Sequence, residues 1–297
     1  MNKITIGYIS DIHADFYCKE YNPGHQNYKK LVKNFATTLL STLEEQVDVL
    51  IIAGDLGHRN DQNKLLLQYL KEKISRIVLV TGNHCLYLVS DSIGEKFNWD
   101  SFGREKEMID FCKSNGIDYL TGDSIEINGF TIAGLGMFWD KSYAEMLSGK
   151  EMSNSVIHEM YEEYMNDLRY IAKGTKPTPI RLPYGGGYLY TKFNEFTYFE
   201  EQKARLDDIK VADIMVTHYI PVPYKSMPLE YKKDISTTFY TFDGKSTIAR
   251  LQPYVWIFGH THNPVKEDYE GTLLLCNPYG YPMERINKKI EVITIEK

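Results

Sequence analysis

Five short apolar runs constrain the fold of this chain most strongly. They are KITIGYIS (3–10), VDVLIIAG (47–54), RIVLVTG (76–82), VADIMVTH (211–218) and VWIFGH (255–260). The segments 28–46 and 64–73 separate the first three runs and carry apolar residues at helical spacing. Continuous apolar strands between amphipathic helices are typical of a sheet buried on both faces. The pattern predicts an α/β fold, with a hairpin around Asn128 and Gly129 and further strands over 272–278 and 289–297.

The pattern changes between residues 137 and 206. A helix that ends in glycine is predicted over 155–174, a loop rich in proline and glycine over 176–190, and a second helix over 196–210. The chain shows neither a repeat nor an obvious linker, so we expect one domain over 1–297 with 137–206 as a helical insertion. Insertions of this kind often shape or cover a site. We therefore expect this one to border the site and to restrict substrate size.

Each of the five apolar runs ends in side chains that can bind a metal. They are Asp11, His13, Asp55, Asn83, His84, His218, His260 and His262. Ligands of open α/β sheets bind outside the carboxyl ends of the strands. One such histidine, or one Gly-Asp pair, would more often be structural, but that explanation does not cover the whole set. Imidazole, carboxylate and amide donors together favour Mn, Fe, Zn, Co or Ni over Ca or Mg. Without His84, which the pattern places beside the ions, seven ligands remain, and they are enough for two divalent ions that share a bridging carboxylate.

The order D-x-H, G-D, G-N-H, H, G-H-x-H resembles the calcineurin-like metallophosphoesterases over nearly the whole chain. The segments MFWD, MNDLRYI and CNPYGYPMER resemble a bacterial and phage branch of that family. The resemblance implies a four-layer α/β/β/α sandwich and a two-metal site for which manganese is the expected activating metal. It implies the following roles. Asp11, His13 and His262 bind the first ion, Asn83, His218 and His260 bind the second, and Asp55 bridges them. His84 lies beside the site without binding a metal and acts as an acid or as a hydrogen-bond donor to the transition state.

Two positions depart from the family pattern. The family usually has an acidic residue after G-N-H, which orients the histidine, whereas this chain has Cys85, and a thiol is a weak hydrogen-bond partner. In the phosphoprotein phosphatase branch the motif is G-D-x-V-D-R-G. Here Arg59 stands at the arginine position, and His58 replaces the aspartate. Arg59 is a candidate for bidentate contact with the substrate phosphate; the alternative is a solvated arginine after a turn.

These features predict a metal-dependent phosphoester hydrolase, first of all a phosphomonoesterase that uses a metal-bridging hydroxide on a phosphorylated small molecule, a nucleotide or a phosphoprotein. The alternative is a phosphodiesterase or nuclease acting on nucleotides or short nucleic acid. It is kept open by basic residues among the tyrosines of the insertion: Lys173, Lys176, Arg181 and Lys192. A non-catalytic scaffold is disfavoured by the full ligand set. The net charge of −6 disfavours long nucleic acid.

The chain carries no signal-peptide pattern and no apolar run long enough for a membrane span. Its four cysteines are scattered, without the spacing of a metal-binding or disulfide framework. We therefore expect a cytoplasmic protein that does not bind membranes. The sequence indicates no oligomeric state.

Overall fold

The structure is a computed structural model that describes residues 2–176, 178–182, 185–189 and 193–297. Two sheets form its centre. The first has the order β13 (Glu291–Glu296), β1 (Lys3–Ile9), β2 (Val49–Ile52), β3 (Ile77–Val80), β4 (Asp118–Leu120). The second has the order β11 (Val265–Tyr269), β12 (Thr272–Cys276), β10 (Val255–Phe258), β9 (Ile214–Val216), β6 (Phe130–Gly134), β5 (Asp123–Ile127). The antiparallel strands β13, β11 and β5 lie at sheet edges, and the inner pairs are parallel.

The alternation of side chains along the strands explains why the two sheets stack. Ile51 of β2 and Ile257 of β10 belong to one apolar layer between the sheets. Their neighbours Leu50 and Ile52 face the opposite way, where they pack under the outer helices of the five-stranded sheet: α2 (Tyr28–Ser41), α3 (Asn60–Lys71) and α5 (Ser101–Ser114). Strands buried on both faces need no polar positions, which is why their sequences read as continuous apolar runs.

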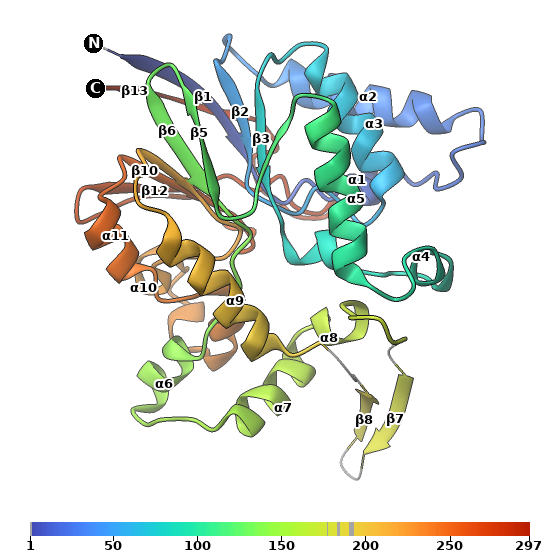
Figure 1. The fold of residues 1–297 in the computed structure, drawn as a ribbon, viewed down its shortest axis with the longest axis vertical. Helices are drawn as coiled ribbons and strands as arrows, with labels where there is room; N and C mark the ends of the chain where they lie inside the picture. Colours follow the sequence, from blue (N-terminus) through green and yellow to red (C-terminus); the bar gives the residue numbers. More distant parts are fainter. Residues whose placement is uncertain (1, 177, 183–184, 190–192) are drawn as a thin grey trace.

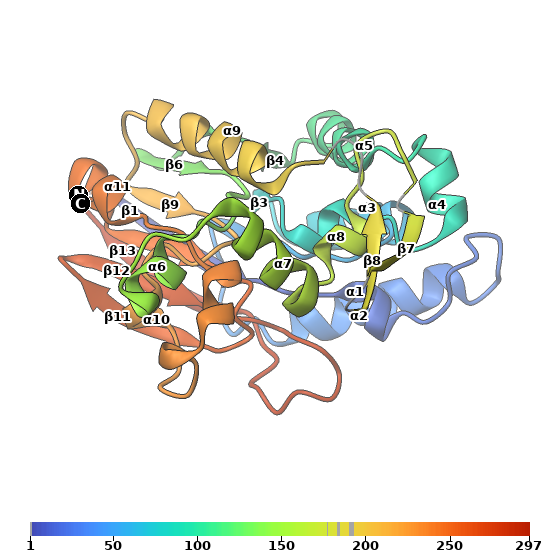
Figure 2. The same ribbon diagram turned by 90° about the horizontal axis from the view of Figure 1, so that it is seen from below.

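Trp256 of β10 belongs to a third apolar layer, on the outer face of the six-stranded sheet. The helices that contribute to this layer include α6 (Ser142–Ser148), α7 (Asn154–Tyr164), α9 (Glu195–Asp208) and α11 (Lys245–Leu251). Figure 2 shows α11 and the group α2, α3 and α5 on opposite sides of the molecule. The predicted four-layer α/β/β/α sandwich is therefore confirmed, and so is the hairpin at Asn128 and Gly129, which joins β5 to β6.

Shorter elements complete the described part of the chain. They are α1 (Ala14–Tyr17), α4 (Asp91–Lys96), α8 (Asp167–Tyr170) and α10 (Pro223–Ser226), together with the 3-10 helices η1 (Asn83–Leu86), η2 (Tyr231–Lys233) and η3 (Ile235–Tyr240). Among the described residues, every helix is too short or too polar to cross a membrane.

The structure corrects two expectations for the region 137–206. The helix predicted over 155–174 is broken at Met165, which has extended backbone (φ −115°, ψ 148°), so that α7 and α8 are separate. The segment predicted as a loop forms an antiparallel hairpin of β7 (Thr178–Leu182) and β8 (Gly185–Leu189), far from the chain termini (Figure 1). Pairing the two strands satisfies their backbone groups, which a loop would leave to water. Lys192 lies outside the described residues, and the division into one domain with an insertion stays a prediction.

Candidate metal centre

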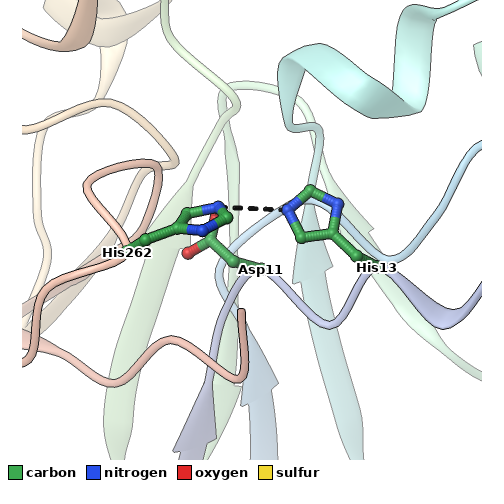
Figure 3. Close-up of side chains that lie close together, drawn as sticks. All are labelled: Asp11, His13 and His262. Carbon is green, nitrogen blue, oxygen red and sulfur yellow. Dashed lines mark hydrogen bonds and ion pairs between the residues drawn. The ribbon is translucent and has the colours of Figure 1, made fainter. Parts of the chain in front are cut away.

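The carboxyl ends of β1, β2, β3, β9 and β10 bring the expected ligands together between the two sheets. Three groups each place their ligand atoms within 4.8 Å of one another: Asp11, His13 and His262; His13, Asp55 and His84; and Asp55, His218 and His260. Figure 3 shows the first group, in which the His13 and His262 rings point toward each other beside the Asp11 carboxylate. The groups share His13 and Asp55, so they form one continuous cluster.

Asp55 lies at the centre of this cluster. Its Oδ2 is 3.8 Å from His13 Nε2 on one side and 3.5 Å from His218 Nε2 on the other. The His13 and His262 Nε2 atoms are 3.1 Å apart, and His262 Nε2 is 3.5 Å from Asp11 Oδ1. This separation of two ligand groups by one shared carboxylate fits the arrangement that the resemblance implies. The individual metal roles stay a prediction.

Hydrogen bonds on the outer side of the cluster orient two histidine rings so that their Nε2 atoms face inward. His218 Nδ1 donates to the Ala53 carbonyl over 2.9 Å, and His262 Nδ1 donates to the Glu284 carboxylate over 2.9 Å. Each bond assigns the proton to Nδ1 and leaves the Nε2 lone pair free for a metal. Glu284 was not among the predicted site residues, although it lies in the segment PMER that carried part of the resemblance.

Asn83 is oriented by a carboxylate in the same way. Its amide nitrogen donates to Asp167 Oδ1 over 2.8 Å, which directs the amide oxygen to within 3.2 Å of His218 Nε2. Asp167 is fully buried and also accepts hydrogen bonds from the hydroxyls of Tyr87 and Tyr161. These bonds draw Asp167 into the core at the break between α7 and α8. The sequence signal for Asp167 was its place in MNDLRYI.

Two glycines in the motifs allow the cluster to close. A β-carbon on Gly54, which has a φ of 86°, would lie 2.3 Å from His218 Nδ1. A β-carbon on Gly82 would lie 2.1 Å from Asp55 Oδ1. Only glycine leaves room for these contacts. The G-D and G-N-H patterns therefore contain glycine because the strand ends approach one another closely.

The backbone at most expected ligands is strained. Five of them have positive φ: Asp11 (50°), His13 (45°), Asp55 (52°), His260 (69°) and His262 (51°). Residues other than glycine rarely adopt this left-handed conformation, and such residues concentrate at functional sites. The observation supports a functional role for the cluster independently of the residue types.

Burial and mutual charge set the protonation of the cluster. Burial disfavours the ionised form of Asp55, but the neighbouring His218 and His84 outweigh it and hold the Asp55 pKa well below its ordinary value. Burial likewise opposes the charged form of His218, yet Asp55 raises the His218 pKa to about 9. Burial lowers the pKa of His13 to about 4 and that of His260 well below its ordinary value. Neutral imidazole and ionised carboxylate are the forms that bind metal ions, so a metal ion at His218 would displace the second proton that this ring holds in the metal-free protein.

A cavity of about 560 Å³ opens beside the cluster. Its lining includes Asp55, Asn83, His84, His260 and His262, tyrosines 164, 231, 240 and 281, and Asn166 and Arg285. Residues 164–166 belong to the region 137–206, so part of that region does border the cavity. The volume is in the range of pockets that hold small molecules.

Arg59 lies away from this cavity. Its guanidinium carbon is 4.1 Å from the centre of the Tyr21 ring, and it lines a smaller, separate cavity with that tyrosine. The contact of Arg59 with the substrate phosphate stays a prediction. The place of Arg59 outside the cavity does not support it. Arg285, which was not among the predicted site residues, is instead an exposed cation at the cavity beside the cluster.

Comparison with known proteins agrees with the fold and identifies the family. The family model of the calcineurin-like phosphoesterases matches residues 4–264. A curated relative, the symmetrical bis(5'-nucleosyl)-tetraphosphatase of Buchnera aphidicola, is 28% identical over 179 residues, which cover 55% of this chain. The chain spans only 59% of the length of that relative. The crystal structure of the phosphopantetheinyl hydrolase PptH from Mycobacterium tuberculosis covers 97% of this chain and 95% of its own, with a TM-score of 0.66 and 16% identity, which shows a shared fold. The chain therefore belongs to the calcineurin-like phosphoesterases, a family of dimetal-dependent phosphoester hydrolases.

Proposed function

We propose that this protein is a phosphomonoesterase that acts on a small phosphorylated molecule of about nucleotide size, with manganese as its activating metal. The observation that carries the proposal is the cavity of about 560 Å³ directly beside Asp55 and His84. A cavity of this size holds one small molecule, and a long polyanion is disfavoured by the net charge of −6.

The donor set fits two divalent ions. Asp11, His13 and His262 would hold one ion, Asn83, His218 and His260 the other, and Asp55 would be shared. When bound, the two ions neutralise charge on the phosphate and make a water molecule more acidic. Carboxylates and imidazoles that are buried this close together are compatible with a site completed by cations.

The other cavity residues act on the substrate itself. His84 faces the cavity, where its Nε2 would hold a proton for the leaving oxygen, a step worth about 10²–10⁴-fold in rate. Arg285 would contact the phosphate or its substituent, and its planar guanidinium suits bidentate contact with phosphate oxygens.

A second candidate function is hydrolysis of nucleotide anhydrides or diesters. Two observations favour it: the similarity to a bis(5'-nucleosyl)-tetraphosphatase and the tyrosines of the cavity wall, on which a base could stack. Both candidates use the same metal centre. They differ in the group that leaves and in the charge on the substrate.

The two candidates are separated by assay of the manganese-loaded protein on matched substrates. The panel contains p-nitrophenyl phosphate, bis(p-nitrophenyl) phosphate, nucleoside mono-, di- and triphosphates and a dinucleoside tetraphosphate. We expect the largest kcat/KM on a monoester, and no turnover by the control variant Asp55→Asn. A preference for the dinucleoside tetraphosphate would select the second candidate. Inactivity on the whole panel with both metals bound would contradict both.

A further inference from the structure

His84 has a second imidazole behind it. Its Nδ1 lies 2.6 Å from Nε2 of His58, and the two rings are stacked with their planes 12° apart. His58 Nδ1 in turn lies 2.8 Å from Oδ2 of Asp15. The three side chains form a row that starts in the protein interior and ends at the cavity. The functions described above assign no role to Asp15 or His58.

The row is enclosed by packed side chains. Asp15 is 6% exposed and His58 is 9% exposed. The Phe16 ring meets the edge of His58 at a centroid distance of 5.6 Å, and Tyr87 stacks on His84 at 4.4 Å. Such packing fixes the ring orientations, so each hydrogen bond keeps one geometry.

The direction of the hydrogen bonds follows from the carboxylate. Asp15 accepts twice from the same residue: Oδ1 from the backbone N–H of His58 over 3.0 Å, and Oδ2 from its Nδ1. An ionised carboxylate only accepts, so Nδ1 of His58 carries a proton, and Nε2 of the neutral ring is an acceptor. His84 must therefore donate from Nδ1. Its Nε2, which is 3.5 Å from the Tyr281 hydroxyl, is left to face the cavity.

We propose that Asp15 and His58 are positioning residues: His58, held by Asp15, accepts the Nδ1–H of His84, so that a proton taken up from water must bind at Nε2, which faces the cavity, and passes from there to the leaving oxygen. Asp15 and His58 orient the His84 ring, as an acidic residue at position 85 would otherwise do. This inference rests on the proposed function for the role of His84, but the hydrogen-bond order is a separate claim about the protein.

The first test reads the tautomer directly. The nitrogen shifts of the His84 ring are recorded by ¹⁵N NMR on the zinc-loaded protein, at a pH where the ring is neutral. We expect the Nδ1–H form in the wild type. In Asp15→Asn one oxygen remains for two donors, so the amide nitrogen faces His58 Nδ1, the order reverses, and His84 shifts to the Nε2–H form. An unchanged tautomer in a folded Asp15→Asn protein would overturn the inference.

The second test compares leaving groups. We expect Asp15→Asn and His58→Ala to lower kcat about 10-fold to 100-fold more on phenyl phosphate than on p-nitrophenyl phosphate, with little change in KM. Added imidazole should restore part of the loss in His58→Ala, whereas thiophene, which has a similar ring without N–H, should not. The matched control is His25→Ala, because the His25 side chain is 44% exposed and lies outside the cavity.

The outcomes separate this inference from the proposed function. Equal losses on both esters, with no imidazole rescue, would contradict the positioning role even if the enzyme is an active phosphatase. An inactive wild type would contradict the proposed function, while the NMR measurement would still decide the hydrogen-bond order. If Asp15→Asn does not fold, rescue of His58→Ala by imidazole decides the positioning role.

Discussion

Replacing Gly82 by alanine tests whether the position of Asp55 controls the reaction. The Gly82 backbone is extended (φ −107°, ψ 170°), so alanine adopts it without strain and the only new feature is one methyl group. That methyl carbon would lie 2.1 Å from Oδ1 and 2.5 Å from the backbone nitrogen of Asp55. Ordinary contact begins near 3.4 Å, so the two strand ends must separate by about 1 Å, and rotation of the Asp55 side chain cannot relieve the contact with the nitrogen.

A displacement of this size is costly for catalysis. Misplacing a reacting group by about 1 Å reduces rates on the order of 10²-fold. We expect Gly82→Ala to lower kcat on p-nitrophenyl phosphate by about that factor, measured by steady-state kinetics at saturating manganese. The matched control is Gly103→Ala in α5, where the new methyl group meets its nearest neighbour at 3.5 Å and should leave kcat unchanged. A folded Gly82→Ala protein with wild-type kcat and metal content would refute the reasoning.

Three further predictions follow from the same geometry. Removal of bound metal with a chelator should lower the Tm in differential scanning fluorimetry, because ions that bind only the folded state stabilise it; an unchanged Tm would contradict a metal centre that joins both sheets. Asp55 raises the His218 pKa to about 9, so the ion pair stabilises the metal-free protein fully below pH 6.5 and this stability is lost as the pH rises through 9. Urea denaturation should show a loss on the order of 3 kcal/mol across that window, and His218→Gln should abolish the dependence. Arg285→Ala should raise KM about 10-fold with kcat nearly unchanged, whereas Arg59→Ala should alter neither; the reverse result would favour the original assignment of Arg59.

The strands could be predicted from their continuous apolar runs. The cluster could be predicted from the rule that ligands bind at the carboxyl ends of parallel strands. The run around Ile51 is apolar throughout because the strand is covered on both faces, and the strand ends at Ile52, just before Asp55. Parallel strands place such ends at a common edge, so eight residues distant in sequence could be grouped before any coordinates.

Other elements depend on contacts that the sequence does not display. The helix α5 has little amphipathic pattern, and its start is marked mainly by Asp100, which caps it by accepting from the Phe102 N–H. The break at Met165 follows from the buried hydrogen bonds of Asp167, whose partners include Asn83, 84 positions away. The partners of the site, Asp15 for His58 and Glu284 for His262, are likewise set by tertiary packing.

The left-handed backbone at the expected ligands has a consequence for engineering. Each such residue costs of the order of 1–3 kcal/mol, so selection for heat resistance alone would favour glycine at positions 11, 13, 55, 260 and 262 and would thereby delete the ligands. At these five positions, folding stability and catalytic activity therefore favour different residues. Gln252 has the same backbone form (φ 48°, ψ 52°) at the end of α11, away from the cluster. Glycine at that helix terminus would relieve backbone strain without changing the metal cluster. Substitutions that raise stability without loss of activity should therefore be sought there and at similar turns away from the cluster.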